Sequence, residues 1–127
     1  MMKISTILWV LWTLALLALL LLPIRNLAPE FGGFRHWDKV AHLGLFTVTG
    51  FMSVYGASFF SRFRNRFIFA LAFSMALAVG TELGQSLVSA RSTSLYDLLA
   101  DFVGLSIGLA TYVLLYNQKN IRMRFRL

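Results

Sequence analysis

Ionisable side chains that could bind a polar ligand or move a proton interrupt the apolar stretches of this sequence. Glu82 stands deepest within such a stretch, and Asp97 and Asp101 stand one helical turn apart. Asp38 and His42 have the same i, i+4 spacing, which places them on one face of a helix. Carboxylates and a histidine brought together suit general acid–base chemistry or the binding of a polar group.

Four apolar segments are long enough to hold these residues in a membrane. At 1.5 Å per residue, about 20 helical residues cross roughly 30 Å of hydrocarbon. The chain is 58% hydrophobic and 13% charged, whereas a soluble domain is about 25% charged. The mean hydropathy is +0.72. We predict an all-α, polytopic membrane protein that forms a single four-helix domain over residues 1–127. Its expected transmembrane helices cover about residues 4–22, 40–60, 67–88 and 97–116.

The lysines and arginines are divided unevenly between the two ends of these helices. The positive-inside rule therefore predicts that both termini lie in the cytoplasm and that the acids lie toward the outer face of the cytoplasmic membrane. With the cations at the ends of apolar segments, we expect contact with membrane lipid and no binding of nucleic acid. The side with both termini holds eight of the twelve cations and none of the five acids: Lys3, Arg62, Arg64, Arg66, Lys119, Arg122, Arg124 and Arg126.

The same topology brings eight polar residues to one depth on the outer side, and we predict that they form a binding site. Because a charge inside a bilayer costs at least about 2.5 kcal/mol, such residues indicate function by default. The second helix, the third helix, the loop after it and the fourth helix supply them: Asp38, Lys39, His42, Glu82, Gln85, Arg91, Asp97 and Asp101.

Small residues continue the polar stripe of the last helix. Gly104 and Gly108 follow Asp101 on the same face and would let a neighbouring helix pack closely. Gly80 and Gly84 offer the same on the third segment. Ser94 stands three residues before Asp97, so it is a candidate N-cap for the fourth helix.

These residues together resemble the VanZ-like family of small bacterial membrane proteins. The resemblance covers residues 38–108 and has one departure, since the family usually has asparagine where this chain has Asp101. It implies an outward-facing site that engages a cell-envelope molecule, either a lipid-linked cell-wall precursor or a glycopeptide antibiotic. The founding member is associated with teicoplanin resistance. The motif is Asp38-Lys39-x-x-His42, Glu82-x-x-Gln85, Arg91 and Ser94-x-x-Asp97-x-x-x-Asp101-x-x-Gly104-x-x-x-Gly108.

The residue types alone leave more than one role open for each side chain. Glu82 could bind a ligand or exchange protons, or it could tie helices together by pairing with Arg91 or Lys39. Arg91 suits a ligand phosphate or carboxylate, and equally the carboxylate of Asp97 or Glu82. His42 could move protons near neutral pH, or it could be a hydrogen-bonded residue at a helix start. We predict no metal site, because no close motif of metal ligands is present.

Three rival functions use the same residues. In an enzyme acting on a lipid phosphoryl or acyl group, Glu82 or His42 would be the base and Arg91 would stabilise developing charge. No cysteine and no recognisable serine nucleophile support this. A transporter is disfavoured because the acids crowd one face and four helices are few without a homo-oligomer. In a scaffold, the polar cluster would only join helices by hydrogen bonds. No cofactor is predicted.

Overall fold

Four helices make up the part of the chain that the structure describes. The computed structural model describes residues 2–22, 35–88 and 94–125, and no strand occurs in these ranges. The fold is therefore all-α, as predicted. The helices are α1 (Ile4–Leu21), α2 (Arg35–Gly56), α3 (Phe63–Val88) and α4 (Leu95–Phe125).

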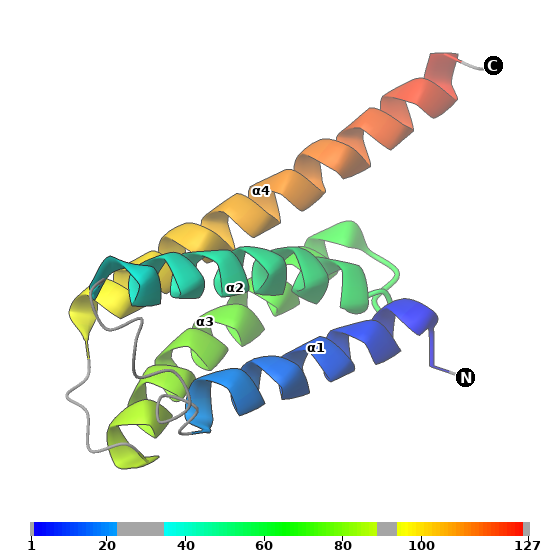
Figure 1. The fold of residues 1–127 in the computed structure, drawn as a ribbon. Coiled ribbons are helices and arrows are strands. Elements are labelled where there is room, and N and C mark those ends of the chain that lie inside the picture. Colours follow the sequence, from blue (N-terminus) through cyan, green and yellow to red (C-terminus); the bar gives the residue numbers. More distant parts are fainter. Residues whose placement is uncertain (1, 23–34, 89–93, 126–127) are drawn as a thin grey trace.

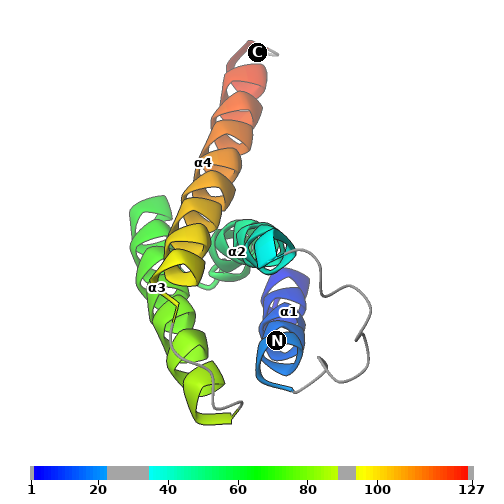
Figure 2. The same cartoon turned by 60° about the vertical axis from the view of Figure 1, so that its left-hand side comes forward.

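The helices alternate in direction along the bundle. Figure 1 shows α1 and α3 running one way and α2 and α4 running the other way, so that the first and last helices have their free ends at the same end of the bundle. Seen from a second side, α2 lies between α1 and α4 (Figure 2). It packs against each of the other three helices. Its most extensive contact is with α4.

Apolar residues from every helix meet in the middle of the bundle. One core cluster joins Leu16 of α1, Phe46 of α2, Ala78 of α3 and Leu105 of α4. Many large apolar side chains face outward instead, and Leu87 of α3 is 86% exposed. Such an outer surface would be costly in water, but it is suited to lipid.

Three helices are long and apolar enough to cross a membrane, namely α1, α3 and α4 over Ile4–Leu21, Phe63–Leu87 and Leu95–Met123. Our prediction of four transmembrane helices is corrected to three candidates, because α2 does not qualify. Its mean hydropathy is lowered by the charged residues at its start, Arg35, Asp38 and Lys39, and by His42, Thr49 and Ser53 further along. The last three side chains are buried against other helices and are therefore hidden from lipid.

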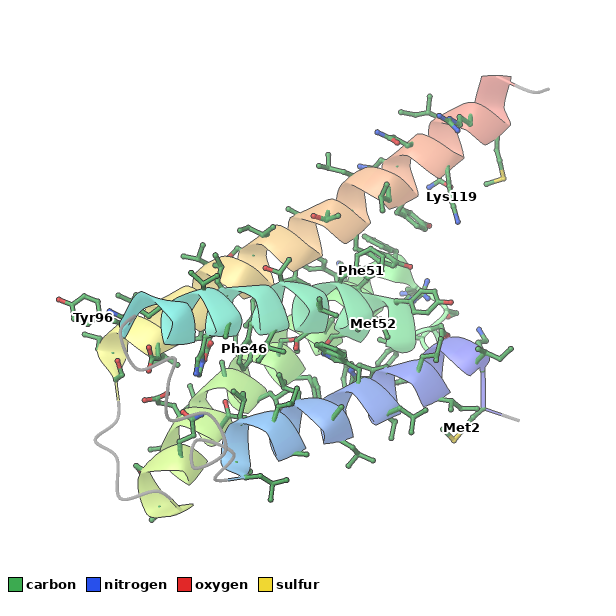
Figure 3. All side chains as sticks on the ribbon, in the orientation of Figure 1. Met2, Phe46, Phe51, Met52, Tyr96 and Lys119 are labelled. Carbon is green, nitrogen blue, oxygen red and sulfur yellow. The ribbon has the colours of Figure 1, made fainter. Side chains whose placement is uncertain are left out.

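The helix ends also differ from the predicted ones. Helix α2 begins at Arg35 instead of residue 40, and α4 continues to Phe125 instead of ending at residue 116. An apolar segment of the sequence marks only the part of a helix that is suited to hydrocarbon. The helix itself continues through polar residues that favour helical conformation. With 31 residues, α4 is about 46 Å long at 1.5 Å per residue. Figure 3 shows Lys119 on the part of α4 that projects beyond the bundle and Tyr96 at its opposite end.

Glycines bring the backbones of α2 and α4 into direct contact. A Cβ on Gly50 would lie 2.6 Å from the carbonyl oxygen of Leu105. A Cβ on Gly104 or Gly108 would collide with a backbone carbonyl oxygen of α2. The predicted close packing at Gly104 and Gly108 is therefore confirmed, with α2 as the partner helix.

Gly80 and Gly84 of α3 do not bring two helix backbones into contact. A Cβ on Gly80 would meet nothing within 4 Å. One on Gly84 would reach only the flexible end of the Leu21 side chain. The prediction of a close helix contact at Gly80 and Gly84 was wrong, because this stretch of α3 passes its neighbours at side-chain distance.

Candidate functional site

The predicted site residues that the structure describes gather at one end of the bundle. This is the end where α1 and α3 finish and where α2 and α4 begin (Figure 1). Asp38 belongs to α2, but its side chain lies outside the described part, and Arg91 lies outside the described residues altogether. The six with described side chains are Lys39, His42, Glu82, Gln85, Asp97 and Asp101.

Ionisable side chains of this group are withdrawn from the surface of the bundle. His42 is 2% exposed, Asp101 0%, and Glu82 and Asp97 7% each. Taking a carboxylate out of water costs several kcal/mol unless hydrogen bonds or charges compensate for it. The partners of each carboxylate therefore decide what the cluster can do.

His42 and Asp101 join the two most closely packed helices. His42 Nδ1 lies 2.9 Å from Asp101 Oδ1, a buried ion-pair distance. Asp101 stands one turn before Gly104, whose missing side chain lets α2 approach at this level. A carboxylate that holds an imidazole nitrogen fixes the orientation of the ring, which is how acid–base histidines are positioned.

Glu82 binds the start of α4. Its Oε1 accepts a hydrogen bond from the backbone N–H of Ser94, while Ser94 Oγ accepts one from the N–H of Asp97 at 3.3 Å. Ser94 is thus the N-cap of α4, as predicted. In a capping box the third helical residue would bind the N-cap N–H. Here the carboxylate of Glu82 in α3 accepts from the Ser94 N–H instead, so the Asp97 carboxylate does not make this hydrogen bond.

Gln85 connects the site to the remaining helix. One turn after Glu82 on α3, its Nε2 donates to the backbone oxygen of Leu20 in α1 at 3.0 Å. Through Gln85, Glu82 and the pair of His42 with Asp101, polar contacts join all four helices at this end of the bundle.

Two carboxylate oxygens in this region have no hydrogen-bond partner within residues 2–22, 35–88 and 94–125, and we call them the two unpaired oxygens. They are Glu82 Oε2 and Asp101 Oδ2, both buried. Glu82 and Asp97 interact electrostatically with Asp101, so the carboxylates share one region. A buried acceptor left without a donor costs about 1–3 kcal/mol. The fold alone therefore leaves this cluster incomplete within the described part of the chain.

Lys39 does not neutralise these carboxylates. Its Nζ lies 4.9 Å from the centre of the Tyr96 ring, in a cation–π contact. Among the described residues no ion pair joins Lys39 to Glu82, so a pairing of Glu82 with Lys39 was wrong; the alternative pairing with Arg91 lies outside the described residues. The same residues include no group of three His, Asp or Glu that could hold a metal ion.

Hydroxyl groups in the middle of the bundle were missed by the sequence analysis. Trp12 Nε1 donates to Thr49 Oγ1 at 3.0 Å, and Ser74 Oγ donates to Ser53 Oγ at 3.0 Å. Thr49, Ser53 and Ser74 are fully buried. The i, i+4 spacing of Thr49 and Ser53 within an apolar segment was the signal that could have revealed this inner polar face.

Replacing Glu82 by glutamine is expected to change the free energy of unfolding by less than about 1 kcal/mol. Glutamine retains an oxygen for the Ser94 N–H. The substitution weakens this hydrogen bond, because it is no longer assisted by a charge, but it also removes the cost of burying that charge. The two effects on the free energy of unfolding offset each other. The measurement is unfolding of the purified protein in one detergent at one pH, with Ser86→Ala, one turn further along α3, as the control. A loss of several kcal/mol would mean that Glu82 is needed mainly for the fold.

Comparison with known proteins gives one match that spans this arrangement. A family model described as VanZ/LLP1 matches residues 4–116, which include all four helices except the last turns of α4 and all eight predicted site residues. No curated protein and no solved structure is matched by the chain. Since the match covers most of the sequence and the helices provide three candidate spans, the chain is a membrane protein that belongs to the VanZ/LLP1 family.

Proposed function

We propose that this protein binds a cell-envelope molecule at the end of the bundle formed by Glu82, Asp97, Asp101, His42 and Gln85. The candidate ligands are a lipid-linked cell-wall precursor or a glycopeptide antibiotic of the teicoplanin type that targets it. Membership of the VanZ/LLP1 family supports the proposal, because this family is associated with glycopeptide resistance through its founding member.

The two unpaired oxygens are the observation that carries the proposal. A cluster that served only to join helices would be expected to satisfy its own buried polar groups, because each unsatisfied group destabilises the fold. Glu82 Oε2 and Asp101 Oδ2 are buried and lack donors among the residues that the structure describes. Strained or unsatisfied groups of this kind are typical of binding and catalytic sites.

Binding to the purified protein in lipid nanodiscs tests this proposal. We expect a labelled lipid-linked precursor or teicoplanin to bind, and Glu82→Gln to weaken that binding at least about tenfold, the effect of losing one charge-assisted hydrogen bond. Gly44→Ala is the control, because a Cβ there meets nothing within 4 Å. If neither ligand binds the wild-type protein, the proposal is wrong.

The orientation in the cytoplasmic membrane is a further part of the proposal. Helix α2 lies between α1 and α4 (Figure 2), so it would cross the membrane together with the three candidate spans; both termini would then lie in the cytoplasm and the site would face outward. The chain has no cysteine, so single cysteines report sidedness without interference. We expect a membrane-impermeant maleimide to label Ser89→Cys on intact cells, and to label Asn65→Cys only after the cells are opened. Labelling of Asn65→Cys from outside would reverse the orientation.

A second candidate function is catalysis on a lipid phosphoryl or acyl group, and the distance between His42 and Asp101 favours it. His42 Nδ1 and Asp101 Oδ1 are 2.9 Å apart, as in the pairs where a carboxylate orients a histidine base. His42 would then take a proton from an attacking hydroxyl group.

Turnover by the purified protein separates this candidate from simple binding. The experiment offers phospholipids and acylated lipids and follows the release of inorganic phosphate or fatty acid. Activity that His42→Gln abolishes and Gly44→Ala retains would establish an enzyme. Ligand binding without turnover would support the binding function and reject the enzyme.

A further inference from the structure

We propose that the two unpaired oxygens bind a primary ammonium group, carried either by a lipid headgroup or by a soluble ligand. This inference rests on the proposed function, because it names the chemical group that the site would recognise. Glu82 Oε2 and Asp101 Oδ2 belong to different helices, α3 and α4. A single partner that satisfied both would lie between these two helices.

The other oxygen of each carboxylate is already used. Glu82 Oε1 accepts from the Ser94 N–H, and Asp101 Oδ1 lies 2.9 Å from His42 Nδ1. These contacts hold both side chains in place, so the two unpaired oxygens are fixed acceptors and do not depend on a ligand for their position. Fixed acceptors bind more tightly than mobile ones, because less conformational entropy is lost.

The charge of the described cluster favours a cation. Glu82, Asp97 and Asp101 bring three carboxylates together, and Asp101 interacts electrostatically with the other two. Lys39, one turn before His42, has its ammonium group over the Tyr96 ring. A phosphate approaching the two unpaired oxygens would meet acceptors that offer it no donor, and it would be repelled by ionised carboxylates.

Among cationic groups, a primary ammonium matches this arrangement best. It presents three N–H donors and a full charge on a single heavy atom, so a single group has enough donors for both unpaired oxygens. A quaternary ammonium has the same charge but no N–H, so it would leave both oxygens without a donor. A lone hydroxyl group has one donor and would satisfy only one of them.

A pair of probes of equal charge tests the donor requirement on the unmodified protein. The measurement is the thermal unfolding temperature in nanodiscs of phosphatidylcholine, with ethanolamine or choline added at matched ionic strength. We expect ethanolamine to raise the unfolding temperature and choline to leave it unchanged. A second set of nanodiscs containing phosphatidylethanolamine tests the lipid source, and stabilisation there without added amine would identify a headgroup as the ligand.

Two variants then locate the effect. Glu82→Gln and Asp101→Asn each remove one acceptor charge and are expected to weaken the amine effect at least about tenfold, as titrated by amine concentration. Asp97→Asn is the matched control, because it removes a carboxylate from the same end of the bundle but neither unpaired oxygen; we expect a smaller change than in the other two variants.

Three outcomes would overturn the inference: equal stabilisation by ethanolamine and choline, no stabilisation by any amine or amine lipid, or an amine effect that survives in both Glu82→Gln and Asp101→Asn. Its failure is distinct from that of the proposed function. Binding of precursor or teicoplanin that Glu82→Gln weakens, without any amine effect, would keep the function and reject the ammonium. An amine effect without binding of either envelope ligand would keep the ammonium site and reject the proposed function.

Discussion

Replacing His42 by alanine is expected to destabilise the bundle by about 3 kcal/mol, since removing one partner of a buried pair leaves the other charge uncompensated. Asp101 is fully buried, and its Oδ1 lies 2.9 Å from His42 Nδ1. Neutral hydrogen bonds between membrane helices contribute only about 0.6 kcal/mol on average. The expected loss is larger because the partner left behind is a carboxylate. The check is the free energy of unfolding in a fixed detergent.

A double-mutant cycle isolates the pair from the other effects of the substitution. Asp101→Asn alone is expected to cost about 1 kcal/mol or less, because asparagine retains an oxygen that can accept from the imidazole N–H. Combining it with His42→Ala should restore about 1–3 kcal/mol relative to His42→Ala alone. A coupling near 0.6 kcal/mol would contradict the interpretation of a charged pair and would place it among ordinary interhelical hydrogen bonds.

Substitution of Gly108 by alanine is the second change with a large expected effect. The added Cβ would collide with the carbonyl oxygen of Thr47 and approach the backbone nitrogen of Phe51 in α2. Backbone atoms cannot move aside as a flexible side chain can, so α2 and α4 must separate. We expect a loss of about 2–3 kcal/mol in the free energy of unfolding, as for other overpacked cores.

Gly80→Ala is the matched control for this prediction. It makes the same chemical change within a helix, but nothing lies within 4 Å of the added Cβ. Because alanine favours the helix more than glycine does, the control should be neutral or stabilising by up to about 1 kcal/mol. If both variants lose stability equally, the cost comes from glycine replacement in general and not from the contact between α2 and α4.

The features that the sequence could predict depend on local spacing. Apolar segments gave the number of helices, and the spacing of Asp101, Gly104 and Gly108 indicated one packed face. Ser94 was identified as a cap from its distance to Asp97. Each of these inferences uses residues within a few turns of one another, where helix geometry fixes which side chains share a face.

The features that the sequence could not predict depend on contacts between distant residues. The sequence left open a pairing of Glu82 with Arg91 or Lys39, but it did not indicate the backbone N–H of Ser94, which binds Glu82 Oε1 in the structure. It counted residues 40–60 as a fourth span from their length and apolar content, and it could not show whether the polar side chains among them face inward or outward. Thr49 and Ser53 show that difference, since both are buried against neighbouring helices.

The backbone contact between α2 and α4 also determines how the site can deform. Helices that touch through Gly50, Gly104 and Gly108 form one stiff body, and His42 and Asp101 are both mounted on it. Glu82 stands on α3, whose contacts with that body run through side chains. A displacement of α3 would have to break the hydrogen bond from the Ser94 N–H to Glu82, whereas the distance from His42 to Asp101 would stay the same. A bulky ligand would therefore gain room only at the cost of the contact that holds Glu82.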